Sequence, residues 1–168
     1  SKVSNNSFVI STFEKNESSV YFKLGESGKL SKDSIGTEKE FLDSMEPMKE
    51  KVAELAKLNV DLIFPQGAPP FMLIGYRGEE AIVRSLEEKH GIPIVTSGMT
   101  QVEALRVLGI KRMIGITYFQ GELNQKFAQY FTDAGFEVLG MEGIPVAFTE
   151  AGRLSYQEVY AFSKKLYL

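Results

Sequence analysis

Short apolar runs alternate with segments of helical periodicity along most of the chain. The run at 110–116 predicts a buried strand, and the apolar positions of 123–134 recur at helical spacing. An alternation of this kind predicts an α/β fold built from parallel-sheet βαβ units with right-handed crossovers. Further strands are predicted at 8–13, 20–24, 60–64, 93–96 and 136–139, and further helices at 37–58, 78–90, 100–108 and 155–168.

Expected helix starts are marked by pairs of a hydroxyl residue and a glutamate three positions later. The side chains of such a pair accept main-chain N–H groups that a helix start leaves unpaired. The apolar stripe of 37–58 continues through Pro47, so we expect one helix that is kinked there. Acidic residues are expected on the outer face of the helix at 78–90, and 65–70 is expected to be a loop. The three pairs of a hydroxyl residue and a glutamate that mark expected helix starts are Thr37 with Glu40, Thr100 with Glu103, and Ser155 with Glu158.

Length and composition limit the number of domains and the kinds of partner. With 168 residues, 43% of them hydrophobic, the chain can form one domain or two small lobes with a packed core. The net charge of −3, without a basic run, argues against nucleic acid or an anionic membrane surface as the main partner. No apolar stretch approaches the roughly 20 residues of a membrane span, so a cytoplasmic protein is expected.

The pattern also bears on domain organisation. A helix-end and strand-start pattern at 58–63 is repeated at 108–113, which fits either two related lobes or two βα units of one sheet. The last predicted helix is not followed by a strand that would complete a crossover. We therefore expect residues 1–100 to form an N-terminal α/β lobe with an incomplete first strand, and residues 101–168 to form the start of a second, truncated lobe.

The absence of cysteine and the presence of a single histidine remove several kinds of chemistry. A thiolate metal site and a cysteine nucleophile are impossible within this chain, and a His-rich metal site or a Ser-His-Asp triad is not expected. We therefore predict no bound metal. Neither Gly-x-Gly-x-x-Gly nor a P-loop is present, which argues against a nucleotide phosphate as the ligand.

Polar side chains and main-chain groups follow three of the predicted strands. Tyr118 lies just after the strand predicted at 110–116. A neutral phenol is a good hydrogen-bond donor to a carboxylate or an enolate. Because ligands of parallel α/β sheets bind at the carboxyl ends of the strands, we expect one crevice that suits a carboxylate-bearing small molecule. For each group the alternative is a structural role in a turn, a helix start or a helix surface. The other candidate binding residues are Gln66, Gly67, Ala68, Ser97, Thr117 and Asn124.

Four parts of the chain, in their order, resemble the aspartate/glutamate racemase superfamily, and within it the branch of maleate cis-trans isomerase and arylmalonate decarboxylase. These parts are 60–70, 91–97, 105–112, and Thr117-Tyr118 with Asn124. The resemblance implies two pseudo-symmetric α/β lobes with an active site between them. It also implies a homodimer or a larger homo-oligomer.

The resemblance further implies a reaction and roles for particular residues. The reaction forms or reprotonates a carbanion or enediolate beside a carboxylate, without a metal or an organic cofactor, and uses one or two cysteines. On this resemblance Tyr118 binds the substrate carboxylate, Asn124 is the asparagine that follows it, and 66–68 is the loop of the first cysteine or its glycine replacement. The chain departs from the pattern because it has no cysteine and because residues 1–36 contain no recognisable opening strand of the family.

Three functional hypotheses follow. The first is a cofactor-independent isomerase, racemase or decarboxylase of a small maleate- or malonate-like dicarboxylate, in which the 66–68 loop and Tyr118 stabilise the developing enediolate. The second is a catalytically inactive carboxylate-binding or regulatory module on the same fold, which the missing cysteines favour. The third is that these 168 residues are part of a longer parent to which the function belongs.

Overall fold

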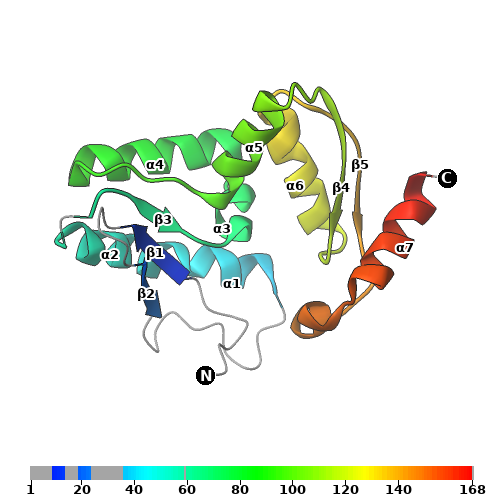
Figure 1. Ribbon diagram of the computed structural model, residues 1–168, viewed down its shortest axis with the longest axis horizontal. Helices are drawn as coiled ribbons and strands as arrows, with labels where there is room; N and C mark the ends of the chain where they lie inside the picture. The colour runs from blue at the N-terminus through cyan, green and yellow to red at the C-terminus, as the bar shows by residue number, and fades with distance from the viewer. Residues whose placement is uncertain (1–8, 14–18, 24–35, 59, 168) are drawn as a thin grey trace.

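The computed structural model describes residues 9–13, 19–23, 36–58 and 60–167 (Figure 1). Strands and helices alternate over most of these ranges, so the predicted α/β class is confirmed. The elements in chain order are β1 (Val9–Phe13), β2 (Ser19–Lys23), α1 (Glu38–Asp43), α2 (Met45–Ala56), β3 (Ile63–Pro65), α3 (Ala68–Leu73), α4 (Tyr76–His90), α5 (Ser97–Val107), β4 (Arg112–Thr117), α6 (Glu122–Asp133), β5 (Glu137–Gly143), the 3₁₀ helix η2 (Phe148–Arg153) and α7 (Tyr156–Tyr167).

Parallel pairing is present in the second half of the chain. The strands β4 and β5 pair in parallel, with one irregularity between Met113 and Ile114, and α6 is the helix that connects them. Ile63 of β3 also forms a parallel bridge to Ile94. The strand predicted at 93–96 is therefore reduced to a single pairing position.

The first sheet differs from the predicted parallel arrangement. Its order is β2-β1-β3, and β1 pairs antiparallel with both neighbours. Strands that are joined by a short connection pair antiparallel, because a parallel pair needs a crossover of about a dozen residues or more. β1 ends at Phe13 and β2 begins at Ser19, which leaves no room for such a crossover.

The segment predicted as one helix kinked at Pro47 is two helices. α1 ends at Asp43 and α2 begins at Met45, with Ser44 between them. The proline ring would clash with the carbonyl group four residues earlier, that of Asp43, if the helix were continuous. With the break at Ser44, Pro47 lies in the first turn of α2, where its missing N–H costs nothing. The predicted capping box at the start of α1 is confirmed.

Part of the segment predicted as a loop belongs to a helix. α3 begins at Ala68, directly after its N-cap Gly67, although 65–70 was expected to be irregular. The prolines at 69 and 70 are its second and third residues, positions where a helix makes no use of the N–H group. Proline-rich composition therefore marks a helix start here.

The start predicted for α5 at Thr100 with Glu103 is wrong. α5 begins at Ser97, because the hydroxyl of Thr96 accepts a hydrogen bond from the N–H of Met99 at 3.2 Å and caps the helix one turn earlier. The hydroxyl of Thr100 instead donates to the Thr96 carbonyl oxygen at 2.7 Å.

The predicted capping box before the last helix is confirmed. The carboxylate of Glu158 accepts a hydrogen bond from the N–H of Ser155 at 2.8 Å, and the Ser155 hydroxyl accepts one from the N–H of Glu158 at 3.3 Å. Both N–H groups of this helix start therefore have side-chain acceptors.

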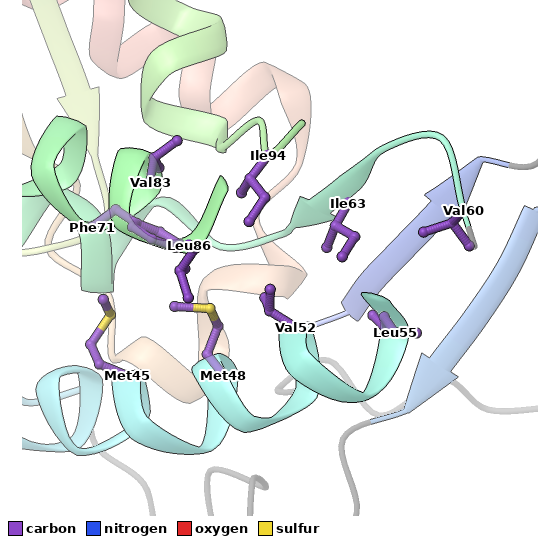
Figure 2. Close-up of a cluster of buried hydrophobic side chains, with 10 residues drawn as sticks. All are labelled: Met45, Met48, Val52, Leu55, Val60, Ile63, Phe71, Val83, Leu86 and Ile94. Atoms are coloured by element: carbon purple, nitrogen blue, oxygen red, sulfur yellow. The ribbon is translucent and has the colours of Figure 1, made fainter. Parts of the chain in front are cut away.

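Two clusters of buried side chains form the core. The first, largely aliphatic, packs α2, α3 and α4 around β3 (Figure 2). The second, largely aromatic, packs α6 against α1, α5 and the β4–β5 pair, and in it Phe119 meets Phe41 and Phe127 edge-on at 5.6 and 5.1 Å between ring centroids. Full burial of each large apolar side chain contributes about 1.5–3 kcal/mol. The first cluster is Met45, Met48, Val52, Leu55, Val60, Ile63, Phe71, Val83, Leu86 and Ile94; the second is Phe41, Met72, Val102, Phe119, Phe127, Tyr130, Phe131, Ala134 and Phe136.

The two clusters fall mostly, though not wholly, on either side of residue 100. Phe41 and Met72 from the first part of the chain belong to the second cluster. The division into lobes at 1–100 and 101–168 stays a prediction. Among the described residues, no helix combines the length and the apolar character of a membrane span.

Candidate active site

A pocket of about 480 Å³ runs along β4 from Met113 to the residues that follow its carboxyl end. Ala68, which follows β3, lines the same pocket as Thr117 and Tyr118 at the end of β4, so two strand ends that are far apart in sequence converge. Further walls come from α6, β5, η2 and α7. The other lining residues are Pro69, Met72, Gln101, Met113, Gly115, Ile116, Phe119, Phe127, Phe131, Met141, Ile144, Ala151, Leu154 and Val159.

Tyr118 is the only titratable side chain among the described residues that line this pocket. Its ring packs against that of Phe119 at 4.5 Å between centroids, and 39% of the residue is exposed. Burial raises the pKa of the Tyr118 phenol above its usual value near 10. The phenol is therefore protonated at neutral pH and can donate a hydrogen bond.

The remaining candidate residues lie outside the walls of this pocket. Gln66 and Gly67 are half-buried and precede α3, and Ser97 is the half-buried first residue of α5. Asn124, in the first turn of α6, lines a separate pocket of about 350 Å³ that shares only Met141 with the first. The structure thus brings Ala68, Thr117 and Tyr118 together, and contact of the other four with a ligand stays a prediction.

The turn that carries Tyr118 is held by side-chain hydrogen bonds on both sides of this residue. The Thr117 hydroxyl donates to Asn124 Oδ1 at 2.5 Å and accepts from the N–H of Phe119 at 3.0 Å. Asn124 Nδ2 donates to the Phe119 carbonyl oxygen at 2.7 Å, and Asn124 is only 7% exposed. Both polar atoms of this buried amide are therefore engaged by the turn.

Residues at the end of β5 also hydrogen-bond to the turn that carries Tyr118. The N–H of Ile144 donates to the Thr117 carbonyl oxygen, and Gln120 Nε2 donates to the Ile144 carbonyl oxygen, each at 2.9 Å. A Cβ atom on Gly143 would lie 2.9 Å from Asn124 Nδ2 and closer still to the Phe119 carbonyl oxygen. Only glycine leaves room for this approach. We call the following residues the turn cluster: Thr117, Phe119, Gln120, Asn124, Gly143 and Ile144.

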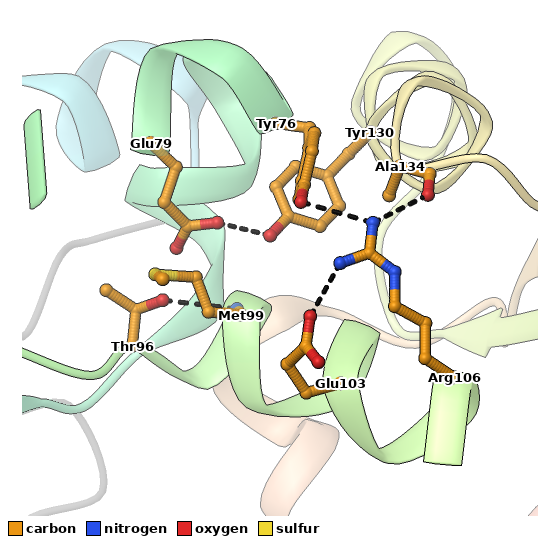
Figure 3. A network of polar contacts seen from close by, with 8 residues as sticks. All are labelled: Tyr76, Glu79, Thr96, Met99, Glu103, Arg106, Tyr130 and Ala134. Atoms are coloured by element: carbon orange, nitrogen blue, oxygen red, sulfur yellow. Dashed lines mark hydrogen bonds and ion pairs between the residues drawn. The ribbon is translucent and has the colours of Figure 1, made fainter. Parts of the chain in front are cut away.

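A second group of buried polar side chains joins α4, α5 and α6 (Figure 3). The hydroxyl of Tyr130 donates a short hydrogen bond to Glu79 Oε2, and both residues are 0% exposed. Glu79 Oε1 has no hydrogen-bond partner among the described residues. Burial raises the pKa of Glu79, although the hydroxyls of Thr96 and Tyr130 act in the opposite direction. We call Glu79, Thr96, Gly98 and Tyr130 the helix cluster.

An exposed layer covers the helix cluster. The guanidinium of Arg106 donates to Glu103 Oε1 at 2.5 Å, to the Tyr76 hydroxyl at 3.2 Å and to the Ala134 carbonyl oxygen at 3.0 Å. Figure 3 shows this guanidinium between α5 and the carboxyl end of α6. The same three helices are thus tied together twice, once by buried groups and once at the surface.

Sequence reasoning missed the burial of Glu79, because the acidic residues of the helix at 78–90 were all assigned to its outer face. The correction has a signal in the sequence: Glu79, Val83 and Leu86 follow the spacing i, i+4, i+7, and all three are buried. A carboxyl on this stripe needs a partner from another element, and Tyr130 supplies it.

Comparison with known proteins places this geometry in a family context. The family model described as Arylmalonate decarboxylase matches residues 35–166. No curated protein sequence matches the chain. The family match covers more than half of the chain and includes the whole of the pocket.

Several solved structures share the fold. The Nocardia farcinica maleate cis-trans isomerase superposes with a TM-score of 0.71 at 19% identity, over 78% of this chain and 56% of that one. The maleate isomerase Iso of Pseudomonas putida S16 gives 0.69 at 18% identity, over 76% and 54%, and an arylmalonate decarboxylase gives 0.62 at 17% identity, over 73% and 54%. At these identities the likeness establishes the fold, and the chain spans little more than half of each relative.

Proposed function

The chain belongs to the arylmalonate decarboxylase family, and on that premise we propose that it is the carboxylate-binding part of a cofactor-independent decarboxylase or isomerase. The proposed substrate is a small dicarboxylate of the malonate or maleate type. The proposed reaction passes through an enediolate or carbanion beside a carboxylate, which Tyr118 and the 66–68 segment stabilise.

The convergence of Ala68 and Tyr118 on one pocket carries this proposal. The N–H of Ala68, the first residue of α3, has no intrahelical acceptor, and it is the donor that this helix start offers, because Pro69 and Pro70 have no N–H. The Tyr118 phenol, with its raised pKa, supplies a neutral donor from the end of β4. Donors from two elements can bind the two oxygens of one carboxylate and the charge that develops on it.

The apolar walls favour a substrate with an apolar substituent. The described lining residues include three methionines and three phenylalanines but no lysine, arginine or histidine. Thioethers and aromatic rings suit an aryl or alkyl group, which a substituted malonate carries and maleate lacks. We therefore propose a substituted malonate in preference to maleate.

Binding without turnover is the second candidate function, because the described residues that line the pocket include no proton donor suited to a carbanion. The chain contains no cysteine, and the pKa of Tyr118, the only titratable side chain among the described lining residues, is raised. A phenol that is a weaker acid than usual holds its proton more tightly. This combination favours a carboxylate-binding module.

A paired screen tests the proposal. The thermal midpoint of the chain is measured with phenylmalonate and with maleate, and release of CO₂ or formation of fumarate is followed under the same conditions. We expect phenylmalonate to raise the midpoint more than maleate does. Turnover supports the enzyme, a raised midpoint without turnover supports the binding module, and no effect of either compound contradicts both.

Tyr118→Phe sharpens this test. Loss of one donor from an oxyanion site costs about 3 kcal/mol, or roughly a hundredfold in rate. We expect Tyr118→Phe to lower turnover by that order if the chain turns over, and to weaken binding if it only binds. Unchanged values would remove Tyr118 from the proposed function.

A further inference from the structure

We propose that Thr117 and Asn124 are positioning residues that act on the ligand through Tyr118, and that Asn124 is not itself a ligand contact. This inference rests on the proposed function, because it gives a role to the residues behind the phenol. The turn cluster fixes the main chain on both sides of Tyr118, and it thereby fixes the place at which the phenol enters the pocket.

The side-chain hydrogen bonds bracket Tyr118 along the chain. The hydroxyl of Thr117 precedes it and accepts from the N–H of Phe119, which follows it, at 3.0 Å. Asn124 links the same two residues, since its Oδ1 accepts from the Thr117 hydroxyl at 2.5 Å and its Nδ2 donates to the Phe119 carbonyl oxygen at 2.7 Å. One hydroxyl and one amide thus close a ring around the Tyr118 backbone.

The position of Asn124 separates it from the ligand site. Thr117, Tyr118 and Phe119 line the pocket of about 480 Å³, whereas Asn124 does not. It is 7% exposed and lines the other pocket, of about 350 Å³. From this position Asn124 is linked to the ligand pocket by its hydrogen bonds to Thr117 and Phe119, which line it.

The end of β5 packs against the turn that carries Tyr118 and prevents the turn from moving toward β5. Gly143 has no space for a Cβ atom, because the Asn124 amide and the Phe119 carbonyl oxygen occupy it. The Ile144 N–H also holds the Thr117 carbonyl oxygen at 2.9 Å. Binding and catalytic groups need placement within about 0.5 Å, and displacement by about 1 Å costs up to a hundredfold in rate.

A double-mutant cycle on phenylmalonate affinity tests the proposal. We expect Asn124→Ala and Thr117→Val each to raise the dissociation constant for phenylmalonate, measured by calorimetry, about tenfold in the wild-type background. In the Tyr118→Phe background the same changes should alter it less than twofold, because the group they position is already gone. Tenfold losses in both backgrounds would overturn the proposal and make Asn124 or Thr117 a direct contact.

Two controls separate positioning from general damage. Thr117→Ser keeps the hydroxyl and should restore affinity to within about twofold of wild type, since the hydrogen bonds to Asn124 and Phe119 remain possible. Gln125→Ala changes an exposed neighbour on the same turn of α6 and should leave affinity unchanged. Equal losses in Thr117→Ser and Thr117→Val would overturn the role of the hydroxyl.

Hydrogen exchange of the Phe119 N–H supplies a readout that needs no ligand. We expect exchange of this amide to become at least tenfold faster in Thr117→Val and Asn124→Ala, while amides of α4 stay protected. Unchanged exchange at Phe119 would overturn the inference even if ligands bind. If wild-type protein binds no phenylmalonate but Phe119 exchange responds as expected, the proposed function fails and the assignment of the turn cluster stands.

Discussion

The turn cluster and the helix cluster bury polar groups at opposite ends of α6. The two clusters differ in how completely these buried groups are hydrogen-bonded. Asn124, a neutral amide near the start of α6, has both polar atoms hydrogen-bonded. Glu79, an acid that meets α6 at Tyr130, has one oxygen bonded and the other without a partner among the described residues. A buried acceptor without a donor costs free energy, whereas a fully bonded amide does not.

This difference indicates separate purposes. The turn cluster fixes the place of one side chain, Tyr118, at the pocket. None of the helix-cluster residues lines the pocket. The cluster instead ties α4 to α6 beside the start of α5, and these last two helices give Phe127, Phe131 and Gln101 to the pocket walls. The turn cluster therefore fixes the position of one residue, whereas the helix cluster fixes the packing of three helices.

Adding a methyl group to the glycine of each cluster is expected to have the largest effects. In Gly143→Ala the new Cβ meets the Phe119 carbonyl oxygen, a main-chain atom that cannot rotate away, so we expect a loss of about 3 kcal/mol or more in the free energy of unfolding. In Gly98→Ala it lies 2.6 Å from the Tyr130 hydroxyl and 2.8 Å from Glu79 Oε2, which are ends of side chains, so we expect about 1–3 kcal/mol. Urea denaturation measures both, and a larger loss in Gly98→Ala would reverse the comparison.

Removal of the Tyr130 hydroxyl is expected to have the next largest effect. Tyr130→Phe leaves the Glu79 carboxyl without its hydrogen-bond donor inside the core, which costs about 1–3 kcal/mol of unfolding free energy. Tyr76→Phe is the matched control on α4, because its half-buried hydroxyl only accepts from Arg106 at 3.2 Å, and it should cost about 0.5 kcal/mol. Equal losses in the two variants would mean that the buried hydrogen bond contributes no more than the surface one.

The smallest and most specific effect is a dependence on pH. Because the pKa of Glu79 is raised from its usual value near 4.5, the folded protein holds a proton over a range in which the unfolded chain has released it. Unfolding free energy therefore falls as pH rises from about 4.5 through the raised pKa, with a slope of up to about 1.4 kcal/mol per pH unit in that range. Thr96, Tyr130 and Glu80 act on the Glu79 carboxyl, and Tyr76 packs against Tyr130; all four residues are left unchanged in the test.

Glu79→Gln removes this titration. We expect the urea midpoint of the variant to fall less than that of wild type between pH 4 and pH 7. Glu88→Gln, on the exposed face of the same helix, should keep the wild-type slope. Parallel curves for wild type and Glu79→Gln would show that the carboxyl does not titrate in this window. The turn cluster has no titratable side chain, so Asn124→Ala should also keep the wild-type slope.

Local sequence signals predicted the elements that depend on neighbouring residues. The periodicity of α6, the capping box at Thr37 and the one at Ser155 are confirmed, because each depends on residues within a few positions. The break at Ser44 and the antiparallel pairing of β1 with β3 were missed. The first depends on where the chain relieves a proline clash, and the second on partners that are more than fifty residues apart.

The sequence predicted only those residues of the candidate site that lie at or just after the end of a strand. Ala68, Thr117 and Tyr118 converge as expected from their places after strands. The methionine and phenylalanine walls were not predicted, because their periodicity is that of any core residue and does not distinguish a wall from an interior. Glu79 was missed because charge outweighed periodicity in its assignment, although its spacing from Val83 places it inside.

The methionines offer the most direct test of the central claim, that the pocket at the end of β4 receives an aryl-bearing carboxylate. The chain has six methionines: Met72, Met113 and Met141 line the pocket, whereas Met45 and Met48 lie in the aliphatic core and Met99 packs against it. Phenylmalonate is titrated into protein labelled with ¹³C at the methionine methyl groups. We predict shifts confined to the first three methyl signals, and shifts of Met45 and Met48 alone, or no shift at saturating ligand, would contradict the claim.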